Sequence, residues 1–296
     1  MNYIILDLEW DSTYFTAQKR FINQILQIGA VKLNKDFEIT DTFEVIIKSD
    51  ISKRVTGRFA RLTGITGEIM RGGVPFAEAV DRYNEWAGEN AVTMTWSNSD
   101  LYTIVENEKN LLSGKRFKIE KYLDLQKFIQ REMCLLGYTD KNQVSLAMAA
   151  EFFDLETEGI DFHTAKDDSL VAAYLLKKCY NEANFTPLIK DTSNPEFFQK
   201  LCFKNYHISN LKDKNIKKEY LEFCCPKCGK KVERVSKWKY SNRWFCANFI
   251  CKCGEKFNGR VTFKKTYDDL IVRQKICEFK EPKAKAQETE AAAATE

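Results

Sequence analysis

The segment at residues 4–9, which reads Ile-Ile-Leu-Asp-Leu-Glu, constrains the fold more than any other part of the chain. A short apolar run of this kind predicts a strand buried in a sheet. Because successive strand side chains point to opposite faces, Asp7 and Glu9 share one face, about 6–7 Å apart. Leu6 and Leu8 then share the opposite, core-facing side. We expect the two acids at the point where the strand leaves the core.

Strand and helix patterns alternate after this segment. Strand-like runs occur at residues 25–33 and 43–47, and a helix opens after Pro75 and ends at Gly88. Shorter strands near residues 92–96 and 122–125 alternate with helices, and a long helix is expected over about residues 165–181. This order predicts a mixed α/β sheet flanked by helices in one domain of ordinary size.

Proline-containing turns at residues 186–187 and 192–195 place the end of this domain near residue 185. The last residues are rich in Ala, Glu and Lys, a composition that is typical of disorder. The predicted organisation is a domain at 1–184, a helical connector at 185–223, a small basic domain at 224–281 and a disordered tail at 282–296.

Acidic residues and one histidine recur at the boundaries of these elements. Two carboxylates spaced like Asp7 and Glu9 can bracket a pair of metal ions about 3.5–4 Å apart, although acids also mark strands that emerge into solvent. Asp100 follows a predicted strand, where a helix N-cap is the alternative role. His163 lies just before the long helix and can approach Asp168 only from the preceding loop. A capping or core role is the alternative for this histidine.

In combination, the Asp-x-Glu pair, Asp100 and the His-x4-Asp pattern of His163 and Asp168 resemble the DEDD exonuclease superfamily, in its histidine-bearing branch. That branch includes bacterial proofreading subunits, ribonuclease T and RNA-trimming 3′ exonucleases. The resemblance covers roughly residues 1–183. Trp10 follows the second acid where many proofreading members carry threonine, and the other motifs look closest to the RNA-trimming group.

The resemblance implies a ribonuclease H-like fold with a five-stranded mixed sheet. It implies that Asp7, Glu9, Asp100 and Asp168 hold two Mg²⁺ or Mn²⁺ ions, which prefer oxygen ligands. His163 is implied as the general base that takes the proton of the attacking water. The products would be nucleoside monophosphates released from a 3′ end.

Ten cysteines without an evident secretory signal favour metal binding or free thiols over disulfides. Cys225 and Cys228 form one pair and Cys251 and Cys253 a second, and each pair is followed by glycine. Two such pairs resemble a zinc ribbon with one structural Zn²⁺. Because the second pair has an unusually short spacing, Cys246 is an alternative ligand and Cys224 a weaker one.

Basic and aromatic residues alternate between the two cysteine pairs, as they do on surfaces that bind phosphates and stack bases. The predicted nucleic-acid contacts are Trp238, Lys239, Tyr240, Arg243 and Trp244. An alternative role for Trp244 is to fill the small core of the ribbon. His207 stands alone in the sequence and receives no role.

The net charge of +4 conceals an uneven distribution. Residues 1–184 carry a net charge of −6 and residues 185–281 carry +11. A basic block of this size indicates a polyanionic partner, with a solvated lysine-rich surface as the alternative.

The longest apolar run, at residues 170–176, is far too short to cross a membrane. We therefore expect a cytoplasmic, metal-dependent 3′–5′ exonuclease that acts on RNA or short single strands. A DNA exonuclease of repair or proofreading, and a non-catalytic nucleic-acid-binding protein on the same fold, are the alternatives.

Overall fold

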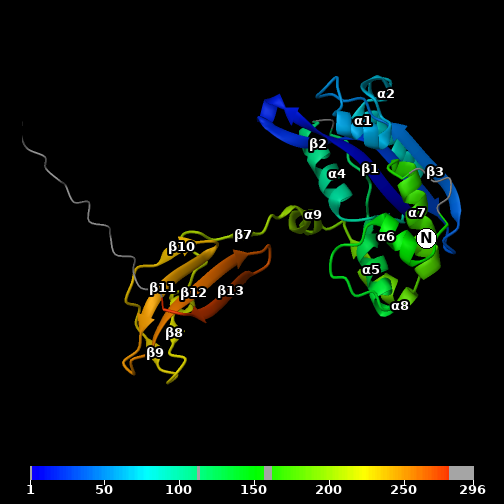
Figure 1. Cartoon of the computed structure of the whole chain (residues 1–296). Coiled ribbons are helices and arrows are strands. Elements are labelled where there is room, and N and C mark those ends of the chain that lie inside the picture. The colour runs from blue at the N-terminus through cyan, green and yellow to red at the C-terminus, as the bar shows by residue number, and fades with distance from the viewer. Residues whose placement is uncertain (1, 112–113, 157–161, 280–296) are drawn as a thin grey trace, which may run out of the picture. The chain divides into compact units, whose positions relative to one another are not determined.

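A computed structural model describes residues 2–111, 114–156 and 162–279. The chain divides into two compact units, Met1–Cys202 and Phe203–Glu296 (Figure 1). The predicted tail at 282–296 lies outside the described residues. Within the described ranges, no helix combines the length and the apolar character that crossing a membrane requires.

The first unit is built on a mixed sheet with the strand order β3-β2-β1-β4-β5-β6. Strands β1, β2 and β3 form an antiparallel meander, β4 and β5 run parallel to β1, and β6 is antiparallel to β5. The strands are β1 (Asn2–Phe15), β2 (Arg20–Leu33), β3 (Ile39–Ile46), β4 (Ala91–Thr95), β5 (Lys121–Asp124) and β6 (Lys190–Asp191). The expected five strands are present, and the two-residue β6 adds a sixth.

Helices cover both faces of this sheet (Figure 1). One face packs against α5, α6 and α7, and the other packs against α3 and α4. The helices of the unit are α1 (Gly57–Thr63), α2 (Gly67–Arg71), α3 (Phe76–Ala87), α4 (Ser99–Asn110), α5 (Leu125–Leu135), α6 (Leu146–Phe152), α7 (Ala165–Cys179), α8 (Glu182–Phe185) and α9 (Pro195–Cys202), with 3₁₀ turns at Thr16–Gln18 and Thr186–Leu188. Alternation along β1 explains the two layers, because Ile5 faces the first helix group while Ile4 and Leu6 face the second.

The expectation that β1 ends at the two acids is wrong. The strand continues to Phe15 because it pairs with β2 along its whole length. A register shift between Glu9 and Trp10 marks the point just after the acids. The parallel pairing of β1 with β4, in contrast, stops at Ile5. Asp7 and Glu9 therefore lie in the middle of β1, immediately beyond the end of its β4 neighbour.

The first unit extends past residue 184, into the segment expected to be a connector. Phe185 is completely buried and its ring contacts the aromatic rings of Tyr3 and Phe128. The backbone N–H of Thr192 donates to the carbonyl of Glu120, next to the pairing of β6 with β5. These contacts explain why the division between the units falls after Cys202.

The second unit contains a sheet with the order β10-β11-β12-β13, and β7 also pairs with β12. A separate small pair joins β8 to β9. The strands are β7 (Tyr206–His207), β8 (Phe223–Cys224), β9 (Lys231–Val232), β10 (Lys239–Ser241), β11 (Trp244–Ile250), β12 (Lys256–Lys265) and β13 (Leu270–Cys277), with a 3₁₀ turn at Lys218–Leu221. One face of the sheet forms an apolar core around Phe245, Phe249 and Phe263.

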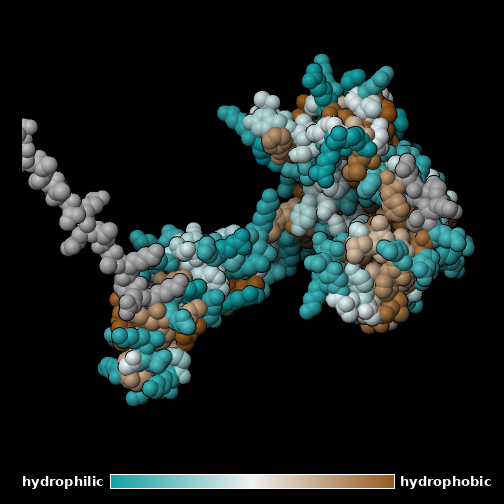
Figure 2. Space-filling view, in the orientation of Figure 1, coloured by the Kyte–Doolittle hydropathy of each residue, from teal (hydrophilic) through white to brown (hydrophobic). Residues whose placement is uncertain are grey.

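Hydrophilic side chains cover much of the visible face of each unit, and hydrophobic residues gather near α5 and α8 (Figure 2). Leu135 and Leu136, at the end of α5, are among the exposed apolar residues.

Candidate active site and cysteine cluster

Asp7 and Glu9 project from the face of β1 that packs against α7. They share this face with Ile5, which belongs to the apolar cluster beneath α7. The neighbouring β4 pairs with β1 only as far as Ile5, so no strand pairs with β1 on that side at the two carboxylates. Both side chains are only partly exposed.

Gly29 brings α7 close to the acids. It pairs with Asp7 across β1 and β2, and a Cβ at this position would lie 2.2 Å from the backbone nitrogen of Lys166. The first turn of α7 therefore rests directly on the backbone of β2. Gly29 was not among the functional residues predicted from the sequence, although an isolated glycine within a strand pattern is a signal for such close approach.

Asp168 completes a cluster of three carboxylates. Helix α7 begins after Thr164, whose side chain accepts a hydrogen bond from the Asp167 N–H. One turn later, Asp168 faces the strand, and single carboxylate oxygens of Asp7, Glu9 and Asp168 lie within 4.8 Å of one another. Three acids this close repel one another when ionised.

Burial raises the pKa of every member of this cluster, and repulsion from neighbouring acids of the site raises the pKa of Asp7 and of Glu9 further. For Asp7 the pKa lies well above its usual value, because of burial and the charges of Asp100, Asp168 and Glu9. Burial, followed by the charges of Asp168 and Asp100, raises the pKa of Glu9 to about 8. Burial also raises the pKa of Asp168, against the opposing influence of the His163 backbone hydrogen bond.

Asp100 lies outside the three-oxygen cluster but close enough to contribute to its electrostatics. It is the second residue of α4, so the alternative of an N-cap role is wrong, and Asn98 precedes the helix instead. The side chain is 4% exposed, and its Oδ1 atom has no hydrogen-bond partner among the described residues. Burial raises the pKa of Asp100 to about 7, while the backbone N–H groups of Asp100 and Leu8 act against this shift.

His163 lies in the loop before α7, as its approach to Asp168 requires. Its backbone N–H donates to Oδ1 of Asp168 at 3.5 Å, and its side chain is exposed. The backbone φ of 78° is in the left-handed region, which histidine tolerates better than most residues. The residue is therefore accessible to solvent beside Asp168.

The acidic cluster fits divalent metal ions. Hard cations such as Mg²⁺ and Mn²⁺ bind to carboxylate oxygens, and a bound cation offsets the repulsion that otherwise keeps these acids protonated. A buried oxygen without a partner, such as Oδ1 of Asp100, is the kind of atom that an ion or a metal-bound water satisfies.

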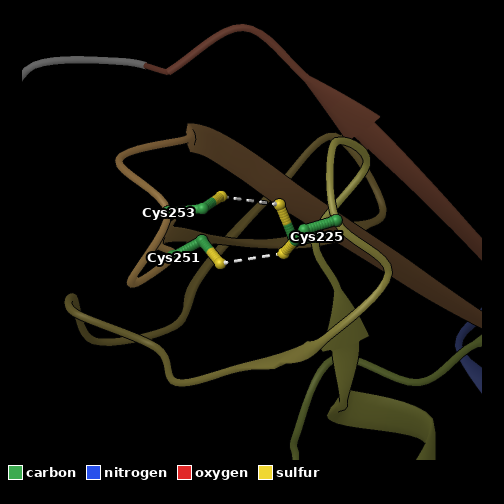
Figure 3. Close-up of side chains that lie close together, drawn as sticks. Cys225, Cys251 and Cys253 are labelled. Atoms are coloured by element: carbon green, nitrogen blue, oxygen red, sulfur yellow. Dashed lines mark hydrogen bonds between the residues drawn. The ribbon is translucent and has the colours of Figure 1, made fainter.

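The second unit contains four cysteine sulfurs within 4.8 Å of one another (Figure 3). The Sγ atoms of Cys225 and Cys253 are 3.6 Å apart, as are those of Cys228 and Cys251. Four sulfurs placed tetrahedrally around Zn²⁺ at about 2.3 Å are separated by about 3.8 Å. The spacing therefore fits a zinc ion.

The two loops that present these sulfurs have a similar construction, although the turn of the second is one residue shorter. Gly229 donates its N–H to the Cys225 carbonyl and Gly254 donates to Cys251, both at 2.9 Å. Both glycines have positive φ, of 71° and 88°, which a residue with a side chain rarely adopts. Each loop can therefore turn tightly around a metal.

The alternative ligands are not in this cluster. The Cys246 side chain lies on β11, where it approaches the Trp244 carbonyl. Cys224 is exposed on β8, outside the group of four sulfurs.

The structure divides the predicted nucleic-acid contacts between two faces of the second sheet. Trp238 packs against the apolar core, with its ring 5.9 Å from that of Phe249. Tyr240 pairs with Phe245 and lies on the same core side. Lys239 and Trp244 point to the opposite face, and Arg243 lies in the turn beside them.

Comparisons with known proteins agree with this architecture. DNA polymerase III subunit epsilon of Aquifex aeolicus (strain VF5) is 25% identical over 184 residues, which are 62% of this chain and 83% of that protein.

Two solved structures share the fold. That of cell-death related nuclease 4 (CRN-4) has a TM-score of 0.51 at 22% identity, over 60% of this chain and 62% of that one. The second is the nuclease domain of 3′hExo, a DEDDh family member, bound to rAMP, with a TM-score of 0.50 at 19% identity. It covers 60% of this chain and 90% of that one.

The family model described as "Exonuclease" matches residues 4–176, a range that includes all four acids and His163. This match covers more than half of the chain, and the chain therefore belongs to the exonuclease family of nuclease hydrolases.

Proposed function

We propose that the first unit hydrolyses single-stranded nucleic acid from its 3′ end, with two Mg²⁺ or Mn²⁺ ions held by Asp7, Glu9, Asp100 and Asp168. The cluster of Asp7, Glu9 and Asp168, with carboxylate oxygens within 4.8 Å, carries this proposal. A binding protein without catalytic activity has no need to bury several mutually repelling acids beside one another.

Within this site, the ions would neutralise charge on the attacking and leaving oxygens of the phosphodiester. His163 accepts a proton from the attacking water as the new phosphorus–oxygen bond forms. The bond to the 3′ oxygen then breaks, this oxygen takes a proton from solvent, and a nucleoside 5′-monophosphate leaves. The exposed side chain of His163 allows the proton to pass on to solvent.

RNA is the favoured substrate class. The DEDDh nuclease domain with the same fold was solved with rAMP bound, which supports a ribonucleotide product. DNA is the second candidate, and the similarity to a DNA polymerase subunit supports it. Contacts to the ribose 2′-hydroxyl would allow the protein to distinguish RNA from DNA.

In the second unit, we propose that Cys225, Cys228, Cys251 and Cys253 bind one structural Zn²⁺. The ion would join two loops whose flanking residues Phe223, Phe249 and Phe257 already pack in one apolar cluster. The basic unit then serves as an additional binding surface for the strand, which the net acidic catalytic domain cannot attract by charge alone.

The test compares single-stranded RNA and DNA of one sequence, each labelled at either end, in the presence of Mg²⁺. Hydrolysis from the 3′ end releases labelled mononucleotide at once from 3′-labelled strands and produces a ladder of shortened 5′-labelled strands. The proposal expects this pattern with a higher rate on RNA. Early mononucleotide release from the 5′ label, or internal cleavage, would contradict the proposed polarity.

A further inference from the structure

The outer face of the second sheet carries cations that the catalytic proposal leaves without a role. Because Phe245, Val261 and Phe263 point into the core, their neighbours on β11 and β12 point outward. One row across the sheet joins Lys239, Cys246, Arg260 and Lys275 in register. A second row joins Thr262 to Arg273, and a third joins His207, Lys264 and Ile271.

A hollow of about 320 Å³ opens on this face. Its lining includes His207, Arg243, Trp244, Thr262, Lys264 and Arg273. Its size lies at the lower end of the range of small-ligand pockets, about 300–1,000 Å³. A single nucleotide of a longer strand is a ligand of suitable size.

Hydrogen bonds fix the floor of the hollow. The buried hydroxyl of Thr262 donates to the Arg243 carbonyl at 2.6 Å and lies 3.1 Å from Nδ1 of His207. Asn242 and Arg243 both have positive φ, so the two-residue turn between β10 and β11 projects Arg243 beside the hollow. The turn, β12 and β7 are therefore tied together at one point.

The hollow is strongly cationic. In the part of the chain that the structure describes, Arg243, Lys264 and Arg273 form no ion pair with a carboxylate. Burial and the charges of Arg243 and Lys264 lower the pKa of His207, which is the effect expected of unneutralised neighbours. These cations are available to an external anion.

An indole completes the arrangement. The half-buried ring of Trp244 lines the hollow, and Nζ of Lys275 lies 4.8 Å from its centroid. A flat ring surrounded by cations matches single-stranded nucleic acid, which presents a phosphate and a stacking base at every step. A phosphorylated protein or an anionic lipid offers the charge but no base.

We propose that this hollow binds a nucleotide unit of single-stranded nucleic acid, with its phosphates on Arg243, Lys264 and Arg273 and a base against Trp244. This proposal extends the proposed function by naming a place where the nucleic acid binds. It rests on that function only for the choice of nucleic acid as the ligand. The proposal assigns roles to Lys264 and Arg273, which the sequence alone left without one, and His207 contributes to the floor of the hollow.

The test measures binding of a fluorescent oligouridine to the full-length chain, with Asp7→Asn in the background to prevent hydrolysis. Lys264→Gln and Arg273→Gln should each weaken binding and reduce the log–log salt slope by roughly 0.7 per lost phosphate contact. Lys212→Gln is the matched control, because this exposed lysine belongs to the segment whose Leu211 and Ile216 pack on the opposite face. It should leave affinity and slope unchanged.

A second pair of variants tests the indole. Trp244→Leu should weaken binding about 5- to 150-fold with the salt slope unchanged, the effect of losing one stacked base. Trp244→Phe should restore most of the affinity, and Tyr240→Leu, on the core side, should have little effect. Zinc content and circular dichroism identify any variant that fails to fold.

The proposal is overturned if Lys264→Gln and Arg273→Gln behave like Lys212→Gln, or if polyphosphate of equal charge displaces the strand as well as oligouridine does. Hydrolysis of a dinucleotide by the unmodified chain reports on the proposed function separately. Binding that depends on the hollow, without any dinucleotide hydrolysis, would refute the catalytic proposal and leave this one standing.

Discussion

At the scale of single residues, Asp100 is the acid whose position depends most on tertiary structure. Asp7 and Glu9 share a strand face by simple alternation, and Asp168 follows from helix geometry once its N-cap is known. Asp100 reaches the same region only because β4 ends early beside β1, so α4 can direct a buried carboxylate toward Leu8. No local pattern in the sequence contains that information.

Gly29 provides a residue-scale prediction. In Gly29→Ala the new Cβ meets the backbone of Lys166 at 2.2 Å, and neither backbone can move without separating α7 from β2. We expect a loss of about 1–3 kcal/mol of unfolding free energy, as for overpacked cores, together with reduced hydrolysis because Asp168 shifts away from Asp7. Denaturant titration and mononucleotide release measure the two effects.

The matched control is Gly57→Ala. Gly57 begins α1, has no strained backbone angle and has open space where the alanine Cβ would lie, with nothing within 4 Å. This change should leave activity intact and raise stability slightly through the unfolded state. Equal behaviour of the two alanine variants would disprove the role given to Gly29.

The pKa of Glu9 leads to a prediction about pH. In the metal-free protein this pKa is raised from 4.5 to about 8, so the folded state keeps a proton that the unfolded chain has already lost. Stability contributed by this group is therefore complete below pH 4.5 and decreases as the pH rises toward 8. The thermal midpoint of the metal-free protein should fall across this range.

Glu9→Gln should make that decline shallower, since the amide does not titrate. Added Mg²⁺ should do the same in the unmodified chain, because metal binding requires the deprotonated acids. Parallel midpoint–pH curves for the metal-free Glu9→Gln and the unmodified protein would show that Glu9 is not the residue responsible.

At the scale of elements, the sequence predicted some features well and others poorly, for identifiable reasons. The helix that closes with Gly88 is present as α3, because its apolar spacing and its terminal residues agree. The predicted end of β1 was wrong, because apolar and polar residues beyond Glu9 alternate too weakly to predict a strand. These residues form a strand through their pairing with β2. The two-residue β6 has too few residues for any periodic pattern.

The cysteine loops show the same contrast. Because the spacing of Cys251 and Cys253 is short, Cys246 remained an alternative zinc ligand in the sequence analysis. Spacing alone does not reveal how a loop folds. In the structure the alternation of β11 directs Cys246 onto the outer sheet face, where it pairs in register with Arg260, away from the other sulfurs.

Removal of one sulfur tests the cluster. Cys225→Ser should abolish stoichiometric zinc binding and lower the stability of the second unit, since a bound structural ion contributes its binding energy to folding. Cys224→Ser is an adjacent control outside the cluster and should keep both properties. Zinc analysis and thermal unfolding of the purified proteins compare the two variants. Equal zinc loss in Cys225→Ser and Cys224→Ser would count against the assigned ligand set.

At the scale of the whole molecule, the boundary between the units decides which fragments fold. A chain that ends at Cys202 keeps the buried ring of Phe185 and the pairing of β6. It should hydrolyse dinucleotides with a kcat within a few-fold of the full chain, and its KM on long strands should rise because the basic unit is missing.

A chain that ends at residue 184 should instead be destabilised by about 3–5 kcal/mol, the usual cost of removing a buried phenylalanine side chain. Thermal unfolding of the two fragments provides the comparison. Equal midpoints would show that the residues between 185 and 202 are not part of the catalytic unit.

The most direct test of the catalytic assignment compares two neighbouring acids in α7. Asp168→Asn removes a charge from the carboxylate cluster, whereas Asp167→Asn removes one from the next residue, which lies outside it. The assignment predicts that Mg²⁺-dependent mononucleotide release falls to a few per cent or less in Asp168→Asn and is largely kept in Asp167→Asn, with both proteins folded. Substantial activity in folded Asp168→Asn, or equal losses in the two variants, would contradict it.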